Sequence, residues 1–232
     1  MMRRARIART AGIATGVATI AAAAAAARVM VTFRASEEER RRAMPGDTVV
    51  PEPMSVTTQA VTIDAPPDRV WPWLAQMGAG RGGWYSHDRI DNGGRPSATA
   101  IRAELQHVAP GDVFPAVPGA TDAFIVAAVD PGRDLVLTVP AADGISGVSW
   151  EFFLVPLERA RTRLLVRARV ASRWREMAVG APRAAGKRRI FIERVYGVLG
   201  RLPMPLMLLA GGFGHRVMQN EQLRGIKRRA EA

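Results

Sequence analysis

The amino-acid sequence predicts an α+β domain in which a curved antiparallel β-sheet is covered by a long C-terminal helix. Residues 113–171 hold a series of strand-like segments that follow one another with turn residues between them, which is typical of an antiparallel meander. Residues 206–229 change to helical spacing. Because an antiparallel sheet with one apolar face needs a covering layer, the final helix is expected to lie across it. Such an arrangement commonly leaves an apolar cavity between helix and sheet.

The composition limits the classes of function. The chain has 232 residues and is 48% hydrophobic, which suits one ordinary domain with an appendage. It has no cysteine, so disulfides, thiolate metal sites and cysteine nucleophiles are excluded. The three histidines, His87, His107 and His215, lie far apart without metal-ligand spacing. We therefore expect no metal and no cofactor.

The net charge is +12, with 33 Lys and Arg against 21 Asp and Glu. An excess of this size suits nucleic acid or an anionic membrane surface, unless the arginines merely reflect genomic base composition. The arginines are not interleaved with aromatic residues, as a platform for stacking bases requires. A membrane surface is the favoured partner, and no nucleic-acid partner is expected.

Residues 1–34 are predicted to be a membrane-anchor or signal-like segment. Four arginines occupy residues 1–9, and residues 10–27 then carry no charge. As a helix, residues 11–33 would extend about 34 Å, enough for a bilayer core. We expect a single N-terminal membrane anchor. A cleaved signal peptide and a surface-lying helix remain alternatives, and the basic residues on both sides leave the side of the main domain open.

Residues 35–55 are predicted to form a short charged helix followed by a proline-rich linker. Ser36 and Glu39 have the spacing of a capping box, and Pro45 with Gly46 ends the helix. The expectation here is a solvated helix and spacer. The main domain is then residues 56–232.

The main domain begins with a strand over Val56–Asp64 and a helix over Pro67–Met77, in which Pro72 removes a helix hydrogen bond. A glycine-rich loop, Gly78–Gly83, follows this helix. Since a phosphate-binding loop follows a strand, its glycine spacing indicates flexible backbone near a cavity. A short helix is expected over Thr99–His107.

Five further strands are predicted, and then two helices. The first of these strands starts at Val113, and the other four cover Phe124–Val129, Asp134–Val139, Val148–Pro156 and Thr162–Ala171. The helices cover Lys187–Arg201 and Leu206–Arg229. In the last strand, Leu164, Val166, Ala168 and Val170 form a buried face, while Arg163, Leu165, Arg167 and Arg169 form a basic, mostly wet face.

Trp84, Tyr85 and His87 are the leading candidates for function because they follow a glycine-rich loop. They are expected to line or gate a cavity mouth, with Tyr85 and His87 offering hydrogen bonds to a ligand. The other interpretation is that both aromatic residues are core plugs and that His87 belongs to a turn. His87 paired with Asp91 is also a candidate general base.

Trp150, His215 and Met218 complete the predicted ligand-binding set. Trp150 lies in a strand and is expected in the core or the cavity wall, which leaves its neighbour Glu151 exposed. His215 and Met218 lie on the final helix, within reach of the cavity, and methionine adapts to varied apolar ligands. Plain core packing of this helix face is the alternative.

Two segments carry a family resemblance. AVTIDAPPDRVWPWLAQMG and SWEFFLVPLERARTRLLVRARV resemble the first strand–helix unit and the paired strands of the SRPBCC superfamily, the START-like or helix-grip proteins that include polyketide cyclase-like members. PGDTVVPEP and GRGGWYSHD resemble an actinobacterial-type branch. The likeness covers residues 56–229, with Arg159-Ala160-Arg161 in place of the usual glycine turn.

The resemblance implies a cavity that binds a small hydrophobic or amphipathic, lipid- or polyketide-like molecule, and it implies no particular reaction. A binding protein without a chemical step is therefore the leading hypothesis. A small cyclase, dehydratase or hydrolase using His87, Asp91 or Tyr85 is the alternative. A non-catalytic interaction domain with a filled core is the third. The oligomeric state is open.

Overall fold

The computed structural model describes residues 23–118, 123–140, 143–172, 198 and 201–232. The chain divides into two compact units, residues 1–32 and residues 33–232. In the first unit, residues 23–31 are helical. Most of the predicted anchor and the predicted helix Lys187–Arg201 lie outside the described residues. None of the helices in the described ranges combines the length and hydropathy that a membrane span needs.

The second unit contains a six-stranded antiparallel sheet with the order β1-β6-β5-β4-β3-β2. Each strand from β2 to β5 is hydrogen-bonded to the strand that follows it in sequence, which confirms the predicted meander. Strand β1 pairs with β6 instead. The strands are β1 (Pro53–Ile63), β2 (Val113–Pro115), β3 (Ala123–Asp130), β4 (Asp134–Pro140), β5 (Ser146–Leu157) and β6 (Arg161–Ala171).

The helices also follow the predicted order. Helix α3 (Pro67–Ala75) ends two residues before the predicted end, and Pro72 lies inside it. The weak helix expected over residues 99–107 is reduced to the 3-10 turn η2 (Ala103–Leu105), and a short helix, α4 (Asp88–Asp91), follows the glycine-rich loop. The final helix α7 (Met204–Glu231) is longer than predicted because Pro205 lies in its first turn, where proline is tolerated.

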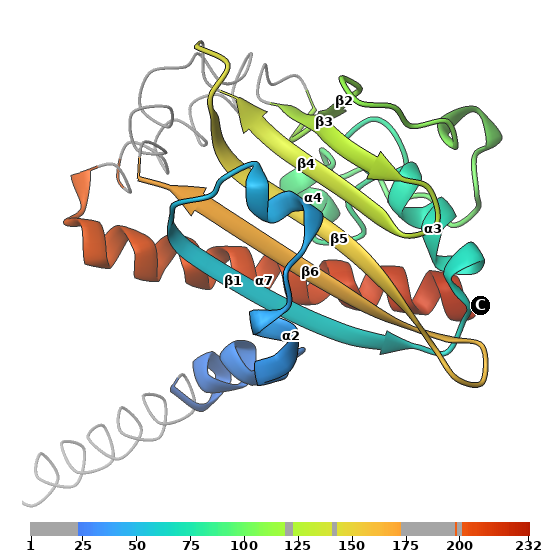
Figure 1. Cartoon of the computed structure of the whole chain (residues 1–232), viewed down its shortest axis with the longest axis horizontal. Helices are drawn as coiled ribbons and strands as arrows, with labels where there is room; N and C mark the ends of the chain where they lie inside the picture. The colour runs from blue at the N-terminus through green and yellow to red at the C-terminus, as the bar shows by residue number, and fades with distance from the viewer. Residues whose placement is uncertain (1–22, 119–122, 141–142, 173–197, 199–200) are drawn as a thin grey trace, which may run out of the picture. The chain divides into compact units, whose positions relative to one another are not determined.

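Helix α7 covers one face of the sheet, here called the inner face. Its C-terminal half contributes Leu223, Ile226 and Ala230 to the main hydrophobic core. That core also contains the apolar residues of α3 and the inward side chains of β1 and β4–β6. The ribbon shows α7 running along the sheet beside β1 and β6 (Figure 1). This arrangement, a curved antiparallel sheet gripping one long helix, is a helix-grip architecture.

The opposite, outer face of the sheet is buried too, which corrects the predicted basic, wet face of the last strand. Leu165 is fully buried and Arg167 is only 3% exposed. The cover is the segment 35–52, predicted to be a solvated helix and spacer. It contains α2 (Glu37–Arg41) and the 3-10 helix η1 (Pro45–Thr48), and it crosses the sheet on the side opposite α7 (Figure 1). Ala35 and Met44 pack with Leu165 in a second hydrophobic cluster.

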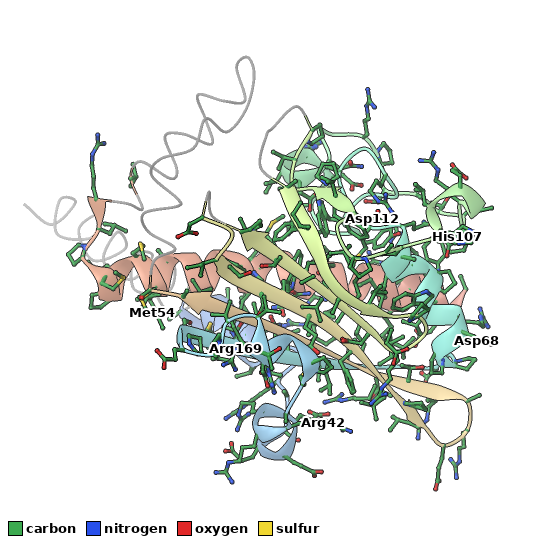
Figure 2. All side chains as sticks on the ribbon, turned by 45° about the horizontal axis from the view of Figure 1, so that its top comes forward. Arg42, Met54, Asp68, His107, Asp112 and Arg169 are labelled. Carbon is green, nitrogen blue, oxygen red and sulfur yellow. The ribbon has the colours of Figure 1, made fainter. Side chains whose placement is uncertain are left out.

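Arg167 explains why this segment stays on the sheet. Its guanidinium donates to both carboxylate oxygens of Asp47 at 3.0 and 2.8 Å, to Thr58 Oγ1, and to three backbone carbonyls of residues 39–42. Arg169 bonds the same carboxylate and the carbonyls of Val50 and Pro51. Figure 2 shows Arg169 beside this segment, to which Arg42 belongs. Alternation alone places these arginines on the outer face, but a partner far away in sequence buries them.

The predicted capping box is present, and it has a second use. Ser36 N donates to Glu39 at 2.7 Å, and Glu39 N donates to Ser36 Oγ at 3.1 Å. The same Glu39 carboxylate accepts two bonds from Arg163 of β6 at 2.7 and 3.0 Å. The bond from Arg163 lowers the pKa of Glu39, against the opposing effect of burial. The start of α2 is thus fixed to the sheet by the residue that caps it.

Glu151 is also buried, at 1% exposure, and the expectation that it is solvent-exposed is wrong. It lies on the outer face beneath Gly46 of η1, where an added Cβ would come within 2.7 Å of Glu151 Oε2. Asp134 of β4 is buried beside it, and one oxygen of each carboxyl group has no hydrogen-bond partner. Burial, and then the proximity of Asp134, raises the pKa of Glu151. Burial raises the pKa of Asp134 as well.

Candidate functional site

The glycine-rich loop folds back on itself and delivers two aromatic residues to the core. Gly78 and Gly83 bond each other through two backbone hydrogen bonds of 3.2 and 3.0 Å. Gly83 has a φ of 83°, and Tyr85 has a φ of 59°, a left-handed conformation that is uncommon for a tyrosine. The loop therefore directs Trp84 and Tyr85 inward, where they are 4% and 2% exposed.

Tyr85 is held in the core rather than at an opening. Its hydroxyl donates to the carbonyl of Trp73 at 3.0 Å, and its ring meets the Trp73 ring edge-on with centroids 5.9 Å apart. The guanidinium of Arg229 lies 4.6 Å from the ring centroid. Burial raises the pKa of the Tyr85 hydroxyl. This geometry corresponds to the core-plug interpretation of Tyr85.

Trp84 and Trp150 form the centre of an aromatic wall on the inner face. Their rings stack with centroids 5.3 Å apart and an interplanar angle of 29°. Phe124 lies 5.1 Å and Phe152 4.9 Å from the Trp150 ring. Trp84 Nε1 donates to the carbonyl of Ala116 at 2.9 Å, which fixes the edge of its ring. Residues from the loop and from β3 and β5 thus build one apolar surface of stacked rings.

Helix α7 faces this wall with His215 and Gln219. The His215 ring meets Trp150 edge-on at a centroid distance of 6.1 Å. Burial, and then the charge of Arg216, lowers the pKa of His215 to about 4. The imidazole is therefore neutral at neutral pH and offers one donor and one acceptor. Gln219 Oε1 accepts from Trp150 Nε1 at 2.9 Å, so the wall and the helix are directly bonded.

Further polar side chains lie between the sheet and α7. Gln219 Nε2 donates to Gln222 Oε1 at 2.7 Å, and Gln59 Nε2 of β1 donates to Asn220 Oδ1 at 2.6 Å. All four residues are at least 97% buried, and Gln59 Oε1 has no partner. Sequence reasoning missed this group, although polar residues at 219, 220 and 222 between two apolar stripes of one helix were a readable signal. A few polar groups in an apolar enclosure are typical of ligand sites.

The inner face is not buried equally along its length. Leu135, Phe152 and Leu164 are fully buried. Val139, Val148 and Val170 are only half-buried, although β4, β5 and β6 continue past the aromatic wall to reach them. Trp150 is half-buried as well. The accessible part of the inner face therefore adjoins Trp150 and His215.

The structure brings together only some of the predicted site residues. Trp84, Trp150 and His215 meet at the aromatic wall. Met218 instead contacts the loop, where its carbonyl accepts from Ser86 Oγ at 2.9 Å. His87 is exposed and immediately precedes α4.

Asp91, the predicted partner of His87, is buried and has one oxygen without a hydrogen-bond partner. Burial, and then the charge of Asp88, raises the pKa of Asp91 to about 6. A carboxyl group tuned in this way can exchange a proton near neutral pH. Since the Tyr85 hydroxyl is already bonded to Trp73, His87 and Asp91 are the polar groups left to the enzyme hypothesis. The described residues contain no cluster of His, Asp and Glu able to hold a metal ion.

No family model and no curated protein matches the chain. Solved structures similar to it include a polyketide cyclase-like protein, Cgl2372 from Corynebacterium glutamicum, with 17% identity over 75% of this chain and 93% of that one, at a TM-score of 0.36. CalU16 from Micromonospora echinospora is 14% identical over 76% and 83% of the two chains, at a TM-score of 0.30. A Thermobifida fusca protein is 19% identical over 70% and 95%, at 0.34.

Similarities of this size carry no argument about function. The assignment of the fold comes from the chain itself, from the strand order of the sheet and the position of α7. The described residues have a helix-grip architecture, and the chain is similar to solved structures that include a polyketide cyclase-like protein.

Proposed function

We propose that this protein binds a small hydrophobic or amphipathic molecule between the inner face of the sheet and α7, without a dedicated chemical step. The observation that carries the proposal is the stacked wall of Trp84 and Trp150, which continues into the half-buried end of the inner face. Flat, rigid aromatic rings offer a large apolar contact area at low entropic cost. The neutral imidazole of His215 beside them supplies a hydrogen bond for the ligand's polar end.

The proposed ligand is lipid-like or polyketide-like in the general sense of an extended apolar body with one polar group. A cationic polar group is disfavoured near His215, because burial and the neighbouring charge of Arg216 keep this imidazole uncharged. The notion that the domain is held at a membrane by residues 1–34 belongs to the same proposal. It is supported by the uncharged run of residues 10–27 and by the net charge of +12.

A filling substitution tests the site. Ala168 lies opposite Trp150 in the β5–β6 register on the inner face and is 8% exposed. In Ala168→Phe the larger side chain is expected to occupy the ligand space. The variant should therefore no longer increase the fluorescence of an apolar probe, while its circular dichroism spectrum stays unchanged. Ala100→Phe, at an exposed loop position, is the matched control and should leave probe binding intact.

The third hypothesis, a filled core, would be supported if the unmodified protein does not increase the fluorescence of such a probe and a fatty acid displaces no probe from it. A folded Ala168→Phe variant with undiminished probe binding would place the ligand elsewhere.

A second candidate, a small cyclase, dehydratase or hydrolase, is favoured by one observation, the buried Asp91 with its raised pKa of about 6. In that case Asp91 acts as the general acid or base and His87, whose charge acts on it, assists. Asp91→Asn would then abolish turnover of a bound ligand while leaving its affinity unchanged. Recovery of the ligand chemically unaltered after incubation with the unmodified protein removes this candidate.

A further inference from the structure

The N-terminal half of α7 presents an apolar surface that the described residues leave open. Leu202, Leu206, Leu209, Ala210 and Phe213 line an open groove. Leu209 is 67% exposed, Leu206 51% and Phe213 38%. Isolated exposed apolar residues are ordinary, but a contiguous group on one face of a helix marks an interaction surface.

A basic group continues this surface. Arg216 follows Phe213 by three residues and therefore lies on the same side of the helix. Arg34 pairs with Gln59 across an isolated β-bridge, and Gln59 bonds Asn220, one turn beyond Arg216. Burial, and then the positive charge of Arg34, lowers the pKa of Arg216. Together with the net charge of +12, this basic end of the surface favours an anionic partner.

We propose that this face of α7, from Leu206 to Arg216 together with Arg34, docks on an anionic lipid surface. An apolar strip with arginines at its end matches a bilayer boundary, where acyl chains lie beneath charged headgroups. The net charge of +12 makes the protein's field attractive to such a surface at long range. The inference goes beyond the proposed ligand site and does not require it.

The course of the chain at Phe33 and Arg34 supports the same docking surface. Arg34 follows directly on the segment of residues 10–33 that the sequence predicts to be membrane-associated. Phe33 also contacts α7, since the Arg224 guanidinium lies 5.5 Å from its ring centroid.

The absence of cysteine permits a clean test in the full chain. A polarity-sensitive fluorophore is attached to Leu209→Cys and, as control, to Leu157→Cys. Leu157 is also an exposed apolar residue, but it lies in the β5–β6 hairpin at the other end of the sheet (Figure 1). Each protein is mixed with phosphatidylcholine vesicles and with vesicles that also contain phosphatidylglycerol. Flotation reports binding of the whole chain, and fluorescence with spin-labelled lipid quenchers reports whether the labelled position enters the lipid.

We expect the label at position 209 to gain roughly twofold or more in emission with anionic vesicles and to be quenched by the lipid-borne quencher, while the label at 157 does neither. Arg34→Gln and Arg216→Gln should each weaken the response at 209 about fivefold, and salt should weaken it further.

A label at 209 that stays in water while the chain floats with the vesicles overturns the proposal. So does an equal response to neutral vesicles, or an equal response at 157. A rise that needs no vesicles but grows with protein concentration assigns the groove to a second copy and overturns it too. Probe binding to the ligand site is titrated on the same samples, so failure of one proposal is distinguishable from failure of the other.

Discussion

The backbone of Tyr85 lies directly against Gly225 of α7. A Cβ at position 225 would clash with the Tyr85 carbonyl oxygen and would come within 2.7 Å of the Tyr85 Cβ. Tyr85 itself has a left-handed φ of 59°. The glycine-rich loop and the final helix therefore meet backbone to backbone, and this contact sets the distance between α7 and the aromatic wall.

Gly225→Ala is expected to destabilise the fold by about 2 kcal/mol or more, because the added methyl group must displace either the loop or the helix. The measurement is equilibrium unfolding by urea. Gly212→Ala is the matched control, since nothing lies within 4 Å of its added Cβ and alanine favours helix. That control should gain up to about 1 kcal/mol in stability. Equal effects of the two substitutions would contradict the close approach at Tyr85.

The bond from Trp150 to Gln219 is expected to couple the sheet to α7. Gln219→Leu leaves the half-buried indole N–H without this acceptor and should cost about 1–2 kcal/mol in the free energy of unfolding. Trp150→Phe removes the donor instead. A double-mutant cycle on these two substitutions should give a coupling energy of about 1 kcal/mol. Strict additivity would mean that the bond contributes nothing in solution.

Arg167 is expected to hold the segment 35–52 on the outer face. Arg167→Met removes six hydrogen bonds and leaves Asp47 with a single arginine partner, so we expect a loss of about 3 kcal/mol. Limited proteolysis should then cut within residues 36–52. Arg41→Met, whose side chain is 79% exposed, is the control and should change stability by less than about 0.5 kcal/mol. An intact segment in Arg167→Met would refute this anchoring role.

The pair of Glu151 and Asp134 predicts a loss of stability as the pH rises from the usual carboxyl range through neutrality. Both pKa values are raised in the folded state, so the folded protein binds more protons than the unfolded chain once the pH exceeds the usual carboxyl range. Stability from this pair is fully present in acid and falls as the pH rises through the folded pKa values, by up to roughly 1.4 kcal/mol per unit of pKa difference.

Glu151→Gln keeps the shape and removes the titrating group, so its stability should fall less steeply between acidic and alkaline pH. Urea unfolding of both proteins across this range measures the difference. Parallel curves for Glu151→Gln and the unmodified protein would mean that Glu151 ionises normally. Glu158→Gln, at an exposed hairpin position, should leave the slope unchanged.

Local patterns were sufficient to predict the order of the strands along the chain and to place their predicted ends within three residues of the observed ones. Alternation in β6 correctly identified the inward residues Leu164 and Val166. It could not indicate that the other face is buried, because the cover comes from residues more than one hundred positions earlier. The run Glu37–Arg41 has the composition of a solvated helix, and none of its residues is buried, but its pairing to the sheet through Glu39 and Arg163 could not be read from the sequence.

The candidate site could be predicted only in part, because local patterns do not indicate contacts between residues far apart in the sequence. The aromatic character of Trp84 and Trp150 pointed to a cavity wall, and the structure stacks them. The direction of the Tyr85 side chain depends on a left-handed backbone conformation. A glycine at this position would have indicated such a conformation in the sequence, but a tyrosine does not. The sequence analysis made no prediction for Gln219 and Gln222, which only their burial and the bond of Gln219 to Trp150 place between α7 and the sheet.

The central claim, a ligand held against the aromatic wall, is tested most directly by native mass spectrometry of the full chain after mild purification. We expect a bound apolar molecule that adds a defined mass and is released on denaturation, and we expect Ala168→Phe to lack it. An unmodified protein that carries no such mass, and acquires none when offered a mixture of fatty acids and membrane lipids, would contradict the account.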